Sequence, residues 1–276
     1  MQMMSMPMPM PMQGSEGGIG PVALAYATSC VGCLLGLSAM TRARSTVGAS
    51  RARWLALGAI AIGGTGIWAM HFIAMLGFTI PGAQITYNVP ITLASLIVAI
   101  VVVGIGLTIA VLGQASMRAL ALGGTITGIG VASMHYLGMS AVNMPASISY
   151  NPWIFIASIV IAITASTAAL WATVNVRGIP ATIGACLIMG IAVTGMHYTG
   201  MAAMEMYAAP LTTREGLTAN QLLLPLIGGI SVSTLVMLFV AGLGPTERDI
   251  QEEAEIHANL DKLASARHLA GYEEFS

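Results

Sequence analysis

Long stretches without a charged side chain are the feature of this sequence that most limits its fold. Residues 54–117, 119–176 and 178–204 contain no Asp, Glu, Lys or Arg. Each stretch exceeds the roughly 20 apolar residues that one helix needs to cross a bilayer. Only 8% of the 276 residues are charged, which is about a third of the share in soluble domains. We therefore expect most of the chain to fold in lipid.

Proline, glycine, asparagine and clusters of charge divide these stretches into candidate spans, each long enough to cross the membrane. We expect an all-α membrane protein, a bundle of seven transmembrane helices that contains repeated helix pairs. The predicted spans are residues 21–40, 54–78, 90–112, 119–141, 152–174, 181–204 and 222–242.

The positions of Lys and Arg predict how this bundle is oriented. Nine of the ten basic residues fall in segments that the predicted spans place on one side, and only Arg214 falls on the other. Cytoplasmic loops hold such an excess. We therefore expect a multi-pass protein of the cell membrane, with its N-terminus outside and its C-terminus in the cytoplasm. This composition offers no basic surface for nucleic acid, so lipid is the expected surrounding.

Two tails flank the predicted bundle. Residues 1–20 begin with MQMMSMPMPMPM, which contains seven Met, and we expect them to form an extended external tail. Residues 21–243 are the expected membrane domain. Residues 244–276 are richer in charge and are expected to form a short cytoplasmic tail.

A twelve-residue motif occurs three times, and each copy carries a histidine. The copies read GTGIWAMHFIAM, GIGVASMHYLGM and GIAVTGMHYTGM, and their histidines are His71, His135 and His197. Each histidine lies about 16 residues from the cytoplasmic end of its span, roughly 25 Å at 1.5 Å per residue. Because the hydrocarbon layer is about 30 Å thick, we expect all three in its outer third.

Methionines flank each histidine, one directly before it and one four residues after it. Positions i and i+4 share a helix face, so an imidazole nitrogen and a thioether sulfur can point together into the bundle. Imidazole suits copper, and thioether favours Cu(I). Glu205 is the only acid close to a motif, so magnesium and calcium are poor candidates. The flanking methionines are Met70, Met75, Met134, Met139, Met196 and Met201.

A purely structural role for these residues is the alternative. A single histidine in a membrane helix is often satisfied by a neighbouring hydroxyl or carbonyl, and methionine commonly fills apolar gaps. Recurrence in three copies, at matched depth and direction, favours a metal or cofactor site instead. Copper is our hypothesis for the cofactor, and a haem held by two of the histidines is the alternative.

The three motif copies resemble the repeated signature of the bacterial MHYT family, whose name is spelled by Met196-His197-Tyr198-Thr199. The resemblance covers roughly residues 21–242. It implies an integral sensor of the bacterial inner membrane that binds copper near the outer face and responds to oxygen, carbon monoxide or nitric oxide. By this resemblance, the metal ligands are Met70, His71, Met75, Met134, His135, Met139, Met196, His197 and Met201.

The first copy departs from the other two beside its histidine. Phe72 stands where the others have Tyr136 and Tyr198, and Ala74 stands where they have glycine. The change at Phe72 removes a hydrogen-bonding phenol but no favoured metal ligand. We therefore expect the site to persist with less symmetric surroundings.

The resemblance also bears on how a signal would leave the membrane. Many family members carry a cyclic-dinucleotide or kinase domain after the last helix, whereas about thirty residues follow it here. Any output is therefore expected to come from a separate cytoplasmic effector.

Several functions remain open on the sequence. The resemblance favours a gas sensor, whereas the methionine-rich tail favours a protein that captures, stores or moves copper, and a haem protein is the third alternative. An enzyme is not expected, because neither a nucleophile and base pair nor a carboxylate pair stands in the membrane region.

Small residues in the first predicted span suggest close packing. Gly32 and Gly36 have the spacing of a close helix contact. Cys30 and Cys33 lie one turn apart, but cysteine is a common packing residue in helices, so metal binding is not the favoured interpretation there.

Overall fold

The structure is a computed structural model, and it describes residues 18–80, 84–208, 216–243 and 256. The chain divides into two units, residues 1–237 and 238–276, and the description below concerns the first. The tails expected at residues 1–20 and 244–276 fall outside the described residues apart from 18–20 and 256. The tail boundaries therefore stay predictions.

Within the described residues, seven helical segments are long and apolar enough to cross a membrane, as predicted. The second of them, Gly48–Met75, is a continuous path made of α2, a π-helix called η1, and α3. The helices are α1 Ile19–Ser45, α2 Gly48–Ala59, η1 Ile60–Ala69, α3 Met70–Met75, α4 Val89–Leu112, α5 Met117–Ser140, α6 Pro152–Asn175, α7 Ile179–Ala202 and α8 Ala219–Leu243.

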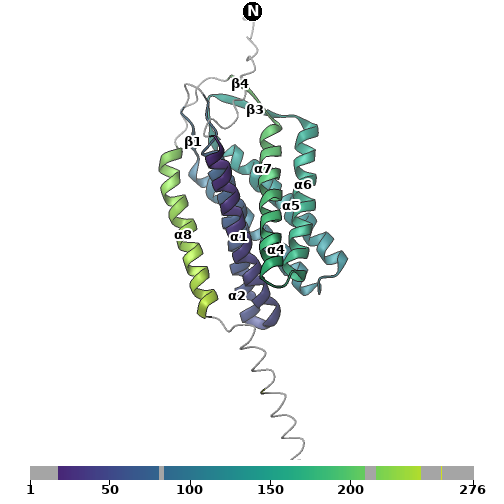
Figure 1. The fold of residues 1–276 in the computed structure, drawn as a ribbon. Helices are drawn as coiled ribbons and strands as arrows, with labels where there is room; N and C mark the ends of the chain where they lie inside the picture. The colour runs from purple at the N-terminus through teal and green to yellow at the C-terminus, as the bar shows by residue number, and fades with distance from the viewer. Residues whose placement is uncertain (1–17, 81–83, 209–215, 244–255, 257–276) are drawn as a thin grey trace, which may run out of the picture. The chain divides into compact units, whose positions relative to one another are not determined.

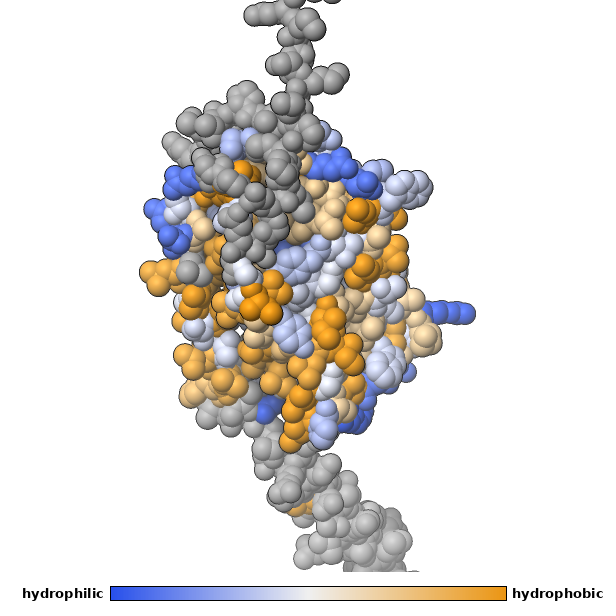
Figure 2. Space-filling model, turned by 45° about the horizontal axis from the view of Figure 1, so that its top comes forward, coloured by the Kyte–Doolittle hydropathy of each residue, from blue (hydrophilic) through white to orange (hydrophobic). Residues whose placement is uncertain are grey.

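The two ends of the bundle differ (Figure 1). One end holds the connections from α1 to α2, from α4 to α5 and from α6 to α7, and we call it the arginine end. The arginines in or beside these connections are Arg42, Arg44, Arg51, Arg53, Arg118 and Arg177. The opposite end, which we call the strand end, holds the short strands. Between them, hydrophobic side chains cover much of the visible side of the bundle (Figure 2), as a surface that faces lipid requires.

At the arginine end, α1 and α2 extend five and six residues past their predicted limits. α1 and α2 are separated only by residues 46–47. The guanidinium of Arg42 lies 5.0 Å from the centre of the Trp54 ring, and Arg44 donates to the carbonyl of Thr173 at 3.1 Å. Because these contacts give the charged side chains partners inside the protein, the helices continue past the point where the hydropathy of the sequence falls.

The connections at the strand end pair with one another as short antiparallel strands. β1 lies between β2 and β5 in one sheet, and β3 pairs with β4 in another. This pairing joins segments that follow different copies of the motif. The strands are β1 Thr86–Tyr87, β2 Val142–Asn143, β3 Ala146–Tyr150, β4 Met204–Ala208 and β5 Leu217–Thr218.

Two asparagines repeat one arrangement beside these strands. The side chain of Asn88 caps α4 by accepting from the backbone N–H of Ile91 at 3.1 Å, and the backbone N–H of Asn88 donates to the carbonyl of Ala141 at 2.8 Å. The side chain of Asn151 caps α6, and the backbone N–H of Asn151 donates to the carbonyl of Ala203, also at 2.8 Å. Each asparagine therefore starts one helix and binds the end of the motif helix that belongs to the next copy.

The ten residues of η1 form a π-helix that includes the first six residues of the first motif copy and ends two residues before His71. Small residues at Gly63 and Gly66 let this wide helix approach its neighbours, because Gly63 lies against the backbone of α4 and Gly66 lies against that of α1. The indole of Trp68 donates to the Ser95 hydroxyl at 3.0 Å. A π-helix of this length is rare, and such segments are frequent at functional sites.

Candidate metal centre

The three motif histidines converge in the interior of the bundle, near the strand end. His71, His135 and His197 come from α3, α5 and α7 respectively, and each is 1% exposed. Nδ1 of His71 lies 3.0 Å from Nδ1 of His197 and 3.2 Å from Nδ1 of His135. One ligand nitrogen from each of the three falls within 4.8 Å of the others. The prediction of a common depth is therefore confirmed.

The three rings are arranged almost symmetrically. Each pair packs edge to face, with centroids 4.9 to 5.1 Å apart and planes at 81 to 82°. Since each motif copy supplies one ring from the same helical position, the sequence repeat becomes a threefold arrangement in space.

The donor set fits a metal ion. Nε2 of His71 and Nε2 of His135 are buried with no hydrogen-bond partner among the described residues. These two nitrogens face Gly138 and Gly200 on the neighbouring helices, whereas the Nδ1 atoms face one another, so the Nδ1 atoms are the candidate ligands. An ion bound by three imidazole nitrogens at about 2.0 Å separates those nitrogens by roughly 3.3 to 3.5 Å. Two Nδ1 spacings, 3.0 and 3.2 Å, lie close to this range, and the ligand nitrogens of all three histidines lie within 4.8 Å of one another.

Two glycines of the motif let the rings pack this closely. A Cβ at Gly138 would lie 2.5 Å from Nε2 of His71, and a Cβ at Gly200 would collide with the ring of His135. Each ring therefore packs against the helix of the next copy, at the residue three positions after that copy's own histidine. The first copy has buried Ala74 at this position, which is the departure noted in the sequence.

The residue after each histidine packs against that histidine's ring. Centroid distances are 4.8 Å for Phe72, 4.8 Å for Tyr136 and 4.9 Å for Tyr198. The hydroxyl of Tyr136 forms a 2.7 Å hydrogen bond with the hydroxyl of Ser158, whereas the hydroxyl of Tyr198 has no hydrogen-bond partner among the described residues. The predicted asymmetry thus involves hydrogen bonding as well as residue type.

The six motif methionines are all buried. Four of them belong to a hydrophobic cluster that continues into the strand end, and two belong to a second cluster toward the arginine end. The first set is Met70, Met75, Met139 and Met201, and the second is Met134 and Met196. Their roles as metal ligands stay predictions.

The strand-end cluster separates the histidines from water. It includes Ile85, Tyr87, Val142 and Met206 from the strands and their connections. The buried hydroxyl of Tyr87 donates to the carbonyl of Met75 at 3.2 Å, and burial raises the pKa of Tyr87 to about 12. The phenol therefore stays neutral and keeps this contact across the physiological pH range.

The remaining candidate residues lie apart from the histidines. Cys33 and Cys186 are buried together in a cluster between α1 and α7, and Cys30 contacts α7 at Gly190. Glu205 lies exposed on β4, where its carboxylate accepts from the Tyr207 hydroxyl at 3.2 Å. Among the described residues, the one group of three or more His, Cys, Asp or Glu that could hold a metal is the histidine cluster.

Comparison with known proteins links this site to bacterial signalling. A family model described as "Bacterial signalling protein N terminal repeat", named MHYT, matches three times, at residues 64–124, 128–185 and 190–249. Each match begins at the opening glycine of a motif copy. No solved structure matches the chain.

Three curated relatives are similar over much of this chain. The bifunctional diguanylate cyclase/cyclic di-GMP phosphodiesterase MucR of Pseudomonas aeruginosa is 42% identical over 55% of the chain and 23% of the relative. The cyclic di-GMP phosphodiesterase NbdA of the same species is 31% identical over 92% of the chain and 34% of the relative. An uncharacterized signaling protein of Caulobacter vibrioides is 32% identical over 90% and 30%.

The chain thus spans between 23% and 34% of the length of these relatives. The three matching repeats cover more than half of the chain and contain all three converging histidines. The protein therefore belongs to the MHYT family of bacterial signalling proteins, as the resemblance of its motifs predicted.

Proposed function

We propose that this protein is an integral membrane sensor that binds copper at His71, His135 and His197 and detects a small diatomic gas. The observation that carries the proposal is the convergence of three buried imidazole nitrogens within 4.8 Å, with no carboxylate in the group. Such a neutral, nitrogen-rich and dry donor set disfavours magnesium and calcium, which take oxygen ligands.

The surroundings support copper over the other metals that bind imidazole. Zinc, iron and nickel also accept imidazole, but thioether selects Cu(I), and six methionines are buried within five residues of the three histidines. A haem with two axial histidines needs its macrocycle between their rings. The rings here pack edge to face with centroids 4.9 to 5.1 Å apart, which favours a single ion.

In the proposed site, the histidines and the methionines have different roles. The imidazoles would hold the ion, which as Cu(I) would supply a coordination position for oxygen, carbon monoxide or nitric oxide. Met75, Met139 and Met201 would be the weaker, exchangeable ligands. Because these methionines pack in the same cluster as the strands, their displacement would shift the packing between α3, α5 and α7 and so change the population of two bundle states.

The output side of the proposal comes from the relatives. The names of two relatives describe synthesis or hydrolysis of cyclic di-GMP. We propose that the signal leaves at the arginine end, on the cytoplasmic side, and reaches a separate effector that changes this nucleotide.

Metal analysis of the purified protein tests the site directly. Each of the variants His71→Ala, His135→Ala and His197→Ala should bind substantially less copper, because removing one of three firm ligands leaves a poor site. His257→Ala, which lies outside the motif copies, is the control and should bind as wild type. Unchanged stoichiometry and affinity in all three motif variants, measured on protein with wild-type circular dichroism, would refute the site.

Infrared spectroscopy of the reduced, copper-loaded protein under carbon monoxide tests gas binding. A copper-carbonyl band is expected in the wild type. Met139→Leu roughly conserves volume, so it should leave copper bound and alter the affinity for carbon monoxide. If copper is present and reduced but no band forms, the gas-sensing proposal fails.

Copper handling is the second candidate, and it rests on the sulfurs. On the arginine-end side of the histidines, Met196, Met189 and Cys33 line one cavity. Met196 and Met189 are seven residues apart on α7, about 10 Å along the axis, which is too far for an ion to pass directly between them. Deleting residues 1–12 discriminates the two functions, since a sensor keeps its response to gas whereas a capture protein loses copper uptake at low copper.

A further inference from the structure

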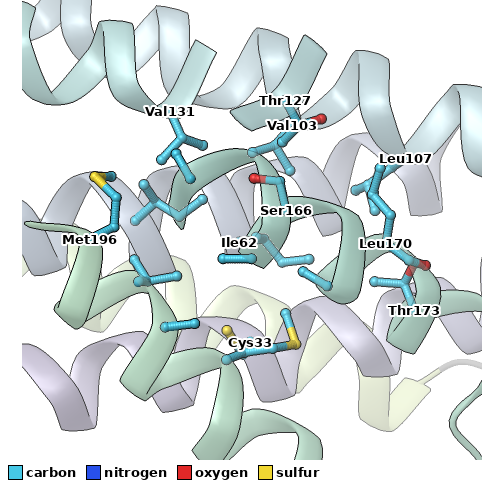
Figure 3. Close-up of a pocket in the computed structure, with 17 residues that line it drawn as sticks. Cys33, Ile62, Val103, Leu107, Thr127, Val131, Ser166, Leu170, Thr173 and Met196 are labelled. Atoms are coloured by element: carbon cyan, nitrogen blue, oxygen red, sulfur yellow. The ribbon is translucent and has the colours of Figure 1, made fainter. Parts of the chain in front are cut away.

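An apolar cavity lies inside the bundle on the arginine-end side of the histidines (Figure 3). Ile67, Val131 and Val193 line it, and each lies four residues before the histidine of its own copy. Four residues are about one helical turn. Met196, which directly precedes His197, also lines the cavity. On all three motif helices, the cavity therefore begins one turn from the histidine cluster toward the arginine end.

The cavity is elongated along the bundle. In Figure 3, Met196 lies at one end, whereas Leu107, Leu170 and Thr173 lie at the other. Its volume is about 40 Å³, whereas a single water needs roughly 10 to 15 Å³ of such space. A molecule of two heavy atoms therefore fits, and a nucleotide or a sugar does not.

The lining does not suit water. It consists mainly of Ala, Val, Ile and Leu side chains. Of the three hydroxyls in the lining, Thr127 donates to the carbonyl of Val102 at 3.4 Å and Thr173 donates to the carbonyl of Leu170 at 2.7 Å, which leaves Ser166 as the one remaining hydroxyl that could bind a water there. A buried water needs two to four polar partners, and apolar cavities without them stay dry and bind species such as xenon.

Part of the lining connects the cavity to the side of the bundle. Ala165 and Ala169 of α6 and Ala192 of α7 line the cavity and are only half-buried. Their small side chains leave little to obstruct a solute that approaches between these helices from the lipid. Small neutral gases are more soluble in hydrocarbon than in water, so lipid is the phase that supplies them.

We propose that this cavity is a docking site for small apolar gas molecules, which enter from the lipid and pass to the histidine centre. The destination rests on the function proposed above, whereas docking itself requires only the cavity. The proposal thus adds a second gas-binding site, one whose lining includes none of the three histidines.

Xenon is the probe for docking, and the metal-free full-length protein in lipid nanodiscs is the sample. The methyl resonances of Val131 and Val103, which line the cavity, should shift saturably with xenon pressure. Val101 and Val160 are 50% and 52% exposed on the outside of the bundle. Their methyl resonances should shift only linearly with xenon pressure, because they meet xenon that is dissolved in the lipid and not bound at a site. A linear response at all four valines would overturn the proposal without reference to the metal.

Two variants change the cavity in opposite directions. Ala165→Leu fills it and should abolish the saturable shift, whereas Val131→Ala enlarges it and should increase xenon occupancy. Ala168→Leu, on the exposed face of the same helix, is the matched control and should behave as wild type. Equal xenon responses in Ala165→Leu and Ala168→Leu would also overturn the proposal, and Val131→Ala keeps the test decisive if the filled variant does not fold.

Carbon monoxide rebinding tests whether gas passes from the cavity to the histidine centre. In reduced, copper-loaded protein, Ala165→Leu should slow carbon monoxide rebinding after flash photolysis severalfold relative to Ala168→Leu. Equal rebinding rates would show that the cavity does not supply the centre. If the wild type binds no carbon monoxide at all, the proposed sensor function fails, and the xenon measurement still decides whether the cavity docks gas.

Discussion

Gly138 and Gly200 set how closely the imidazole of the preceding copy approaches its neighbouring helix. A methyl group at Gly200 would meet the ring of His135, which also packs against the rings of His71, Tyr136 and His197. We expect Gly200→Ala to lower copper affinity about ten- to a hundredfold, the usual effect of disturbing a group that orients a metal ligand.

Competition with a Cu(I) chelator measures that affinity. Gly195→Ala on the same helix is the control, because a Cβ there meets no described atom within 4 Å. If the two variants bind copper equally, ring placement by Gly200 is not important for the site.

Tyr136 and Tyr198 occupy the same motif position but differ in hydrogen bonding. Tyr136→Phe removes the 2.7 Å bond to Ser158 and should lower the free energy of unfolding by about 1 kcal/mol. Tyr198→Phe removes a hydroxyl that has no hydrogen-bond partner among the described residues, so stability should be unchanged or slightly higher. Thermal unfolding in detergent compares the two variants, and a larger loss for Tyr198→Phe would contradict the difference in bonding.

At the residue scale, the sequence predicts the site well where one motif carries the information. His71, His135 and His197 were recognisable because their spacing repeats and places them at one depth. The contacts of Gly138 and Gly200 were not, since a glycine in a helix can serve packing, flexibility or nothing specific. The direction in which each ring points, toward the next copy, depends on helix rotation, which spacing alone does not determine.

Among the elements, α1 and η1 approach each other backbone to backbone. A Cβ at Gly32 would lie 2.5 Å from the Cα of Gly66, and backbone cannot move aside as a side-chain end can. Gly32→Ala should therefore destabilise the protein by about 1 to 3 kcal/mol, the range for overpacking a core. Gly20→Ala on α1 is the control, because a Cβ there meets no described atom within 4 Å. Equal stability of the two variants would mean that the close contact is relieved elsewhere.

Helix identity was predictable at the element scale, because hydropathy and helix length depend on local sequence. The close helix contact expected at Gly32 and Gly36 is present, since both glycines lie against the second helical segment. The π-helix η1 and the five short strands were not predicted. Two-residue strands form through pairing between distant segments, and a π-helix differs from an α-helix in hydrogen bonding rather than in composition.

For the whole molecule, orientation in the membrane is the prediction that remains open. Reporter fusions after Arg44, Arg118 and Arg177 should behave as cytoplasmic, since Lys and Arg collect in cytoplasmic loops. Fusions near Gln84 and Ser147, at the strand end, should behave as external. A reversed signal at any two of these sites would invert the proposed orientation and place the strand end in the cytoplasm.

The packing of each histidine ring on the following copy also determines when the site can exist during biosynthesis. A nascent chain that has inserted only as far as α5 contains His71 on Gly138, but His135 still lacks Gly200 and the third nitrogen is absent. The centre is complete only after α7 has entered the bilayer. Acquisition of an ion would therefore follow membrane insertion, and a chain that stalls before α7 would leave the ribosome without a functional centre.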